Sequence, residues 1–141
     1  MFNIGNPNKM IGFTNGCYDI LHVGHLNLFR YLKERCEIVV VGIDSDKRVK
    51  QLKGVNRPFN NQDDRKFMLK SLRFVDEVYI FNTEQELTEM VQSIKPDLMV
   101  VGSDYKHKRV IGADYAKKLE FFEKIDGYST TKILQNRFDR G

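Results

Sequence analysis

Residues 10–44 read MIGFTNGCYDILHVGHLNLFRYLKERCEIVVVGID and contain a complete strand–helix–strand pattern. The apolar run 10–14 predicts a first strand, and apolar residues close to helical spacing predict a helix over 24–35. Residues 37–44 form a β-branched run, which is typical of a parallel strand buried on both faces. The order predicts a βαβ unit with a right-handed crossover.

The same alternation continues through the rest of the chain. Further helices are expected over 45–53, from Asn60 or Asn61 through Arg73, over 84–93, and after a cap at Ser129. Further strands are expected over 75–81, over 98–101 and, as a possible fifth, over 119–123. This pattern predicts a Rossmann-like, doubly wound parallel sheet of about five strands with helices on both faces. The length predicts a single domain, 1–141.

Composition narrows the class of protein. The chain has 141 residues, of which 41% are hydrophobic and 30% charged, with ten Phe and six Tyr, so it is globular rather than disordered. No apolar run approaches the roughly 20 residues of a membrane span. The N-terminal residues lack the pattern of a secretory signal, and two cysteines suit a reducing compartment. We therefore expect a cytoplasmic protein that is not bound to a membrane.

Positive charge is concentrated in residues 44–73, which contain nine Lys or Arg and four acidic residues. The whole chain has a net charge of +4. Such a stretch favours an anionic ligand, either nucleic acid or a phosphorylated small molecule. A solvated helix face is the other interpretation. Few aromatic residues are interleaved with the cations, so stacking on nucleic-acid bases is poorly served and no nucleic-acid partner is expected.

The loop after the first strand, residues 15–25 (NGCYDILHVGH), lies where an open α/β sheet binds its ligand. His22 and His25 have i, i+3 spacing at a helix start, which puts both rings on one side. Gly16 allows close backbone approach, and Gly24 leaves room above the first helical turn. With the N–H groups of that turn, the loop can hold a polyphosphate between two imidazoles.

Zinc is an alternative for Cys17, His22 and His25. Structural zinc usually needs four ligands, and no second Cys or His pair follows, so no metal held by the protein alone is predicted. The loop also lacks the lysine and spacing of a Walker A motif, and it is not GxGxxG.

The loop resembles a known signature. Its residues Gly16, Tyr18, Asp19, His22, Gly24 and His25 resemble the HxGH signature of the cytidylyltransferase-like nucleotidyltransferase superfamily. Residues 127–132 (GYSTTK) are similar to the second signature of that superfamily, the Ser/Thr-rich start of the last helix. The resemblance extends from about residue 11 to residue 134.

Two branches of the superfamily are most similar. The adenylyltransferase domain of ADP-heptose synthase is similar at residues 14–25, at 52–54 with 57–58, at 96–98 and at 102–106. Glycerol-3-phosphate cytidylyltransferase is similar at 65–66, 74–78 and 129–132. This chain departs from both branches. The first branch usually has a glycine where Ser103 stands and an asparagine where Lys132 stands. The second branch has a threonine where Cys17 stands.

The resemblance implies a reaction in which a sugar-phosphate oxygen attacks the α-phosphorus of a nucleoside triphosphate and pyrophosphate leaves. Positioning and electrostatics would then supply most of the catalysis. The implied catalytic residues are His22, His25, Lys53 and Arg65. The implied nucleotide-binding residues are Gly16, Cys17, Tyr18, Asp19, Gly24, Asp104, Tyr105, Ser129, Thr130 and Thr131, and the implied acceptor-binding residues are Asp46 and Lys50. Mg²⁺ and a homodimer are implied as well.

Several of these residues have a plainer interpretation. Asp19 carries the wrong sign for phosphate, so it either fixes the loop or helps to hold Mg²⁺ through water. Arg65 is otherwise a partner of Asp63 or Asn61, and Lys50 is otherwise solvated. Ser129 is also an ordinary N-cap candidate.

Three functions follow from these observations. The first is an enzyme that makes ADP-heptose from ATP and D-glycero-D-manno-heptose 1-phosphate for lipopolysaccharide biosynthesis, with CTP and glycerol 3-phosphate as the alternative substrates. The second is a nucleotide-binding module without catalysis, and the third is a nucleic-acid-binding protein. We expect the first, because both signatures and both histidines are present.

Overall fold

A computed structural model of the chain describes residues 8–103 and 108–123, which form a five-stranded parallel sheet in the order β3-β2-β1-β4-β5. The strands are β1 Ile11–Gly16, β2 Ile38–Asp44, β3 Glu77–Phe81, β4 Leu98–Gly102 and β5 Leu119–Phe122. The helices are α1 Val23–Arg35, α2 Asp46–Lys53, α3 Gln62–Lys70, α4 Glu84–Ile94 and the short 3₁₀ helix η2 Ala113–Tyr115. The predicted Rossmann-like, doubly wound sheet is confirmed, and the expected helix after Ser129 lies outside the described residues.

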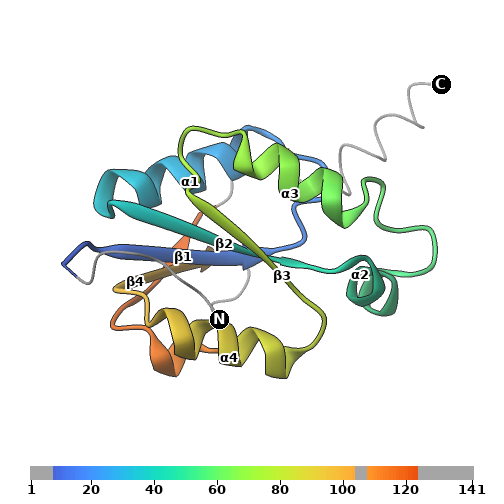
Figure 1. Cartoon of the computed structure of the whole chain (residues 1–141). Helices are drawn as coiled ribbons and strands as arrows, with labels where there is room; N and C mark the ends of the chain where they lie inside the picture. The colour runs from blue at the N-terminus through green and yellow to red at the C-terminus, as the bar shows by residue number, and fades with distance from the viewer. Residues whose placement is uncertain (1–7, 104–107, 124–141) are drawn as a thin grey trace.

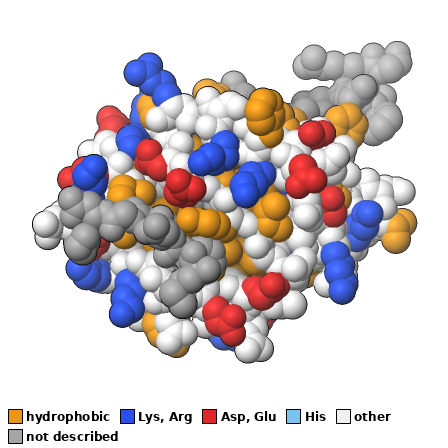
Figure 2. All heavy atoms as spheres, viewed as in Figure 1, with side chains coloured by type: hydrophobic (Ala, Val, Ile, Leu, Met, Phe, Trp, Pro, Cys, Tyr) orange, Lys and Arg blue, Asp and Glu red, His pale blue; other side chains and the backbone are white. Residues whose placement is uncertain are grey.

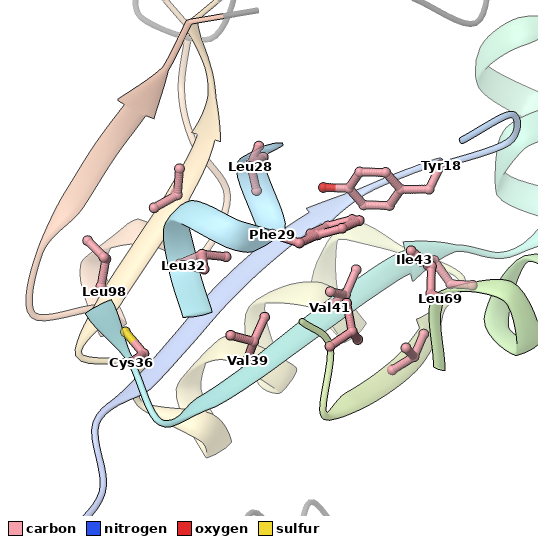
Figure 3. Close-up of a cluster of buried hydrophobic side chains, with 13 residues drawn as sticks. Tyr18, Leu28, Phe29, Leu32, Cys36, Val39, Val41, Ile43, Leu69 and Leu98 are labelled. Atoms are coloured by element: carbon pink, nitrogen blue, oxygen red, sulfur yellow. The ribbon is translucent and has the colours of Figure 1, made fainter. Parts of the chain in front are cut away.

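The sheet is covered on both faces (Figure 1). Alternate residues of a strand point to opposite faces, so Val39 and Val41 of β2 pack with α1 and α3 while Val40 packs with α4. Figure 3 shows the first of these clusters, in which Phe29 and Leu32 of α1 lie over the central strands. Burial on both faces explains why the β-branched run 37–44 carries almost no polar residues.

Two predicted boundaries were wrong by a few residues. Helix α3 ends at Lys70 and not at Arg73, because the Ser71 N–H is shared between the carbonyls of Phe67 (3.1 Å) and Met68 (3.2 Å), which tightens the last turn. Strand β3 begins at Glu77 and not at residue 75, because the Val75 N–H closes a turn onto Leu72 at 3.2 Å.

The strand order reverses between β1 and β4, since the chain adds β2 and β3 on one side of β1 and then β4 and β5 on the other. Ligands of doubly wound sheets bind near this point, beyond the carboxyl ends of the strands. Helix α2 lies beyond the carboxyl end of β2, where the chain leaves the sheet (Figure 1). Among the described residues, no helix is both long and apolar enough to cross a membrane.

Candidate active site

His22 and His25 lie together at the start of α1, at the carboxyl end of β1. Their rings stack with centroids 3.7 Å apart and an interplanar angle of 24°. His22 is the N-cap of the helix, and its Nδ1 accepts the Gly24 N–H at 3.1 Å. The His25 Nδ1 in turn accepts the His22 N–H at 3.4 Å. The structure therefore brings the two predicted histidines together and holds each through one ring nitrogen.

These contacts fix which nitrogen of each ring carries the proton. A ring nitrogen that accepts an N–H bond carries no hydrogen, so the ring hydrogen of His22 and of His25 is on Nε2. The backbone N–H groups of Gly24 and His25 bond to His22 itself, at its Nδ1 and its carbonyl oxygen. The expectation that backbone donors of this turn face phosphate is therefore revised. The imidazole Nε2–H groups become the donors, beside the positive end of the helix dipole.

The side chain of Tyr18 is buried and packs against His25. Its backbone φ of +49° lies in the left-handed region, and its side chain is only 7% exposed. The ring packs edge-on against His25, with ring centroids 5.0 Å apart. It also packs beside Phe29, with centroids 5.2 Å apart (Figure 3). A Cβ on Gly16 would lie 3.1 Å from the Tyr18 ring, so Gly16 makes room for tyrosine. Tyr18 therefore has a packing role in this structure, and its predicted nucleotide contact stays a prediction.

Asp19 ties this loop to the segment before α3. Its carboxylate is 1% exposed and accepts the backbone N–H groups of Phe59 and Asn60, each at 2.8 Å. It also pairs with the Arg57 Nε at 3.3 Å, and the Asn60 side chain donates to the Asp19 carbonyl at 2.7 Å. The carboxylate thus binds protein donors, which favours the interpretation that Asp19 fixes the loop geometry, and its predicted nucleotide contact stays a prediction.

Arg65 is the largest fully buried side chain and joins three segments. Its guanidinium donates to the carbonyls of Cys17 (2.9 Å), Asp44 (2.8 Å) and Asn60 (3.0 Å). Its Nη2 also pairs with the Asp46 carboxylate at 2.8 Å. A guanidinium that is 0% exposed presents no surface to a phosphate in this structure. In this structure Arg65 fixes the ends of β1 and β2 relative to α3, and its predicted phosphate contact stays a prediction.

A cavity of about 210 Å³ lies at the carboxyl ends of the central strands. It is lined by the predicted residues Gly16, Cys17 and Lys53, together with Asp44 and Arg48. Lys53 is exposed and has no recorded ion pair with the described residues, which leaves its ammonium group available to an anion. Burial raises the pKa of the Cys17 thiol, although the nearby Lys53 and Arg65 partly oppose this shift, so the thiol is neutral at pH 7.

Asp46 and Lys50 do not face this cavity. They line a separate cavity of about 230 Å³ with Pro58, Phe59 and Asn60. Residues i and i+4 share one side of a helix, so Asp46 and Lys50 lie on a different side of α2 from Arg48 and Leu52. The Asp46 carboxylate is also engaged by Arg65. The two predicted acceptor-binding residues therefore line a different cavity from Lys53.

The positive stretch 44–73 is partly neutralised within the fold. Four of its nine cations are paired, Arg48 with Asp44, Arg57 with Asp19, Arg65 with Asp46 and Lys70 with Glu77. On the face seen in Figure 2, Lys and Arg side chains are scattered among acidic ones. On this face the mixed charges do not form the continuous basic surface that is typical of nucleic-acid binding, and the absence of a nucleic-acid partner stays a prediction.

Several predictions remain untested by the structure. Asp104, Tyr105, Ser129, Thr130 and Thr131 lie outside the described residues. Within the described part of the chain, no three His, Cys, Asp or Glu side chains form a group that could hold a metal ion. Sequence reasoning gave Arg48 no role, although its position four residues after Asp44 is a recognisable ion-pair spacing.

Comparison with known proteins places the chain among nucleotide-dependent enzymes. The family model described as cytidylyltransferase-like matches residues 13–136. A bifunctional protein HldE from Campylobacter fetus is 42% identical over 134 residues, covering 95% of this chain and 29% of that protein. The HldE protein of Nitratiruptor is 46% identical, covering 90% of this chain and 27% of that protein. The chain thus spans less than a third of the length of these relatives.

Two solved structures share the fold. A lipopolysaccharide core biosynthesis protein from Thermoplasma volcanium has a TM-score of 0.69 at 21% identity and covers 84% of this chain and 100% of its own. A pantoate-beta-alanine ligase from Francisella tularensis has a TM-score of 0.59 at 15% identity and covers 93% of this chain and 66% of its own. At these identities the likeness concerns the fold alone.

Proposed function

The chain belongs to the cytidylyltransferase-like family, and on that premise we propose that it transfers the adenylyl group of ATP to D-glycero-D-manno-heptose 1-phosphate, giving ADP-heptose and pyrophosphate. The HldE relatives, at 42% and 46% identity, support the heptose branch over the glycerol-phosphate alternative. The product would be a nucleotide-activated sugar for lipopolysaccharide synthesis.

One observation carries the proposal, namely the stacked pair of His22 and His25 at the start of α1. Each ring accepts at Nδ1, so each neutral ring presents an Nε2–H donor. Two such donors at the positive end of α1 suit the triphosphate of a nucleotide, where negative charge spreads as the reaction proceeds. A folded module without chemistry would not need two aligned imidazoles at this point.

The reaction makes one bond and breaks one. A phosphate oxygen of the acceptor attacks the α-phosphorus of ATP, and the bond from that phosphorus to the oxygen bridging to the β-phosphate breaks, so pyrophosphate departs with that oxygen. The attacking oxygen is already ionised at neutral pH, so no strong general base is needed. His22 and His25 stabilise the charge on the triphosphate, and Lys53 draws the acceptor phosphate towards it.

Mg²⁺ would accompany the triphosphate and neutralise part of its charge. The nearby protein carboxylates are poorly suited to hold the ion by themselves. Asp19 is buried and committed to backbone donors, and Asp44 is paired with Arg48. In this proposal the ion binds mainly to phosphate oxygens and water, which is the usual manner of Mg²⁺ with nucleotides.

The protein would act in the cytoplasm as a homodimer, without a nucleic-acid or membrane partner. The dimer rests on the family resemblance, and the exposed Leu52, Val55, Phe59 and Phe67 provide apolar surface for it. Light scattering tests this part, with a mass of about twice 16.5 kDa expected for the chain.

Pyrophosphate release in a matrix of substrates tests the function. ATP and CTP are each paired with heptose 1-phosphate and with glycerol 3-phosphate in the presence of Mg²⁺. The proposal predicts release only with ATP and heptose 1-phosphate. Release only with CTP and glycerol 3-phosphate would assign the other branch, and silence in every pair with nucleotide still bound would contradict both.

A further inference from the structure

The cavity of about 210 Å³ has one pair of charged side chains that the proposed chemistry does not use, Asp44 and Arg48. Asp44 ends β2, and Arg48 lies on α2 one turn later. Their side chains are 15% and 14% exposed, and the Arg48 Nε donates to the Asp44 Oδ1 at 2.7 Å. Both residues line the cavity together with Lys53.

The Arg48 guanidinium is held at one edge only. Its carbon lies 5.6 Å from the centre of the Phe81 ring, so Phe81 and Asp44 fix its plane. Among the described residues, no group accepts a hydrogen bond from its two terminal nitrogens, and none donates to the second Asp44 carboxylate oxygen. A guanidinium fixed in this way offers a planar pair of donors without a further loss of side-chain entropy.

Arg48 and Arg65 differ in how many of their hydrogen-bond donors are bound to protein oxygens. The Arg65 guanidinium makes four hydrogen bonds to protein oxygens and is fully buried, so its donors are spent on structure. The Arg48 guanidinium makes one hydrogen bond, to Asp44, and lines a cavity. Half-buried donors and acceptors that lack protein partners are favourable only where water or a ligand satisfies them.

The pair also has the chemistry of a polyol site. Arg48 supplies donors and Asp44 supplies an acceptor side by side, which matches neighbouring hydroxyls that both give and receive hydrogen bonds. Apolar side chains of the same cavity that retain exposed surface, namely Leu52, Val110 and Ile111, can contact the C–H face of a sugar ring. Lys53 lies five residues after Arg48 and lines the same cavity, so its ammonium group is a candidate partner for the acceptor phosphate.

We propose that Asp44 and Arg48 form the subsite that binds the hydroxyl groups of the acceptor sugar, with the acceptor phosphate directed towards Lys53. This inference rests on the proposed function and names the residues that select its acceptor. It replaces Asp46 and Lys50, which line the other cavity. Arg48 then sets the apparent affinity for the sugar phosphate and leaves the affinity for ATP unchanged.

Steady-state kinetics of Arg48→Ala test the subsite. The KM for heptose 1-phosphate should rise by about 10- to 100-fold while the KM for ATP stays within about twofold, since the lost bonds concern the acceptor alone. Lys47→Ala removes a positive charge from an exposed position of the same helix outside both cavity linings and serves as the matched control. An unchanged acceptor KM, an equal rise in both KM values, or a rise in Lys50→Ala instead would overturn the inference.

A second Arg48 variant and a binding measurement complete the kinetic test. Arg48→Lys retains the charge but not the planar fork, so it should recover less than half of the lost apparent affinity if hydroxyl recognition is involved. It also replaces the alanine variant should that variant fail to fold. Calorimetric binding of heptose 1-phosphate to the unmodified chain separates the two proposals. Binding that is lost in the Arg48 variants, in a protein without turnover, would support the subsite and contradict the function, whereas no binding at all would overturn the subsite.

Discussion

The two sides of helix α2 carry the same kind of ion pair in different surroundings. On one side, Asp46 pairs with the fully buried Arg65, whose other donors all reach backbone carbonyls. On the other side, Asp44 pairs with Arg48 at the wall of a cavity that Lys53 also lines. The first arrangement stabilises the loops that carry the histidines, and the second leaves donors and acceptors for a ligand. The acceptors of its hydrogen bonds therefore distinguish an arginine that stabilises the fold from one that can bind a ligand.

The largest expected effect concerns the structural side. Arg65→Ala should lower the free energy of unfolding by about 3–5 kcal/mol, because it leaves Asp46 and three carbonyls without their buried partner. Urea denaturation measures this change. Arg48→Ala, on the cavity side, should cost only about 1 kcal/mol, since water in the cavity can hydrate Asp44. Equal losses in the two variants would remove the distinction between the sides.

The next effect concerns Lys53. Lys53→Ala should lower kcat/KM by about 10- to 100-fold, because an ammonium group that contacts phosphate in the transition state is lost. Its stability should not change, since the side chain is exposed. Lys66→Ala, an exposed charge on α3, should retain full activity and provides the control. A loss of activity in both variants would indicate a general electrostatic effect and not a contact.

The smallest effect concerns the Cys17 thiol on the cavity side. Its pKa is raised chiefly by burial and is lowered in part by Lys53. A raised pKa means less thiolate at pH 7.5, so alkylation by iodoacetamide should be slower than for free cysteine and should accelerate as the pH rises. In Lys53→Ala the alkylation rate should increase at a higher pH than in the unmodified chain, because the charge that lowers the pKa of Cys17 is lost. Mass spectrometry of the Cys17 peptide follows the alkylation. A shift to lower pH would contradict the placement of Lys53 beside Cys17.

Much of the fold could be predicted because its signals are local. The β-branched run 37–44 predicts a central strand, and the apolar positions Leu87, Met90, Val91 and Ile94 predict the inner side of α4, which the structure confirms. Boundaries at Ser71 and Val75 could not be predicted, because they depend on turn hydrogen bonds between neighbouring segments.

The candidate site divides in the same way. The position of His22 and His25 follows from a strand end and a helix start, which are local features. The roles of Asp19 and Arg65 depend on partners far along the chain, such as the bond from Arg65 to the Cys17 carbonyl across 48 residues. Residue type and spacing predicted that these charges lie near the site, but only the packed structure distinguishes a committed charge from an available one.

In the proposed reaction, the paired imidazoles at the start of α1 stabilise the triphosphate during adenylyl transfer. Its most direct test is pyrophosphate release from ATP and heptose 1-phosphate by the unmodified chain beside His22→Ala and His25→Ala, each confirmed as folded by circular dichroism. The account predicts one pyrophosphate per ADP-heptose formed, with kcat lowered by about 10²- to 10³-fold in each variant because one donor to the triphosphate is lost. Rates in both variants close to that of the unmodified chain would contradict it.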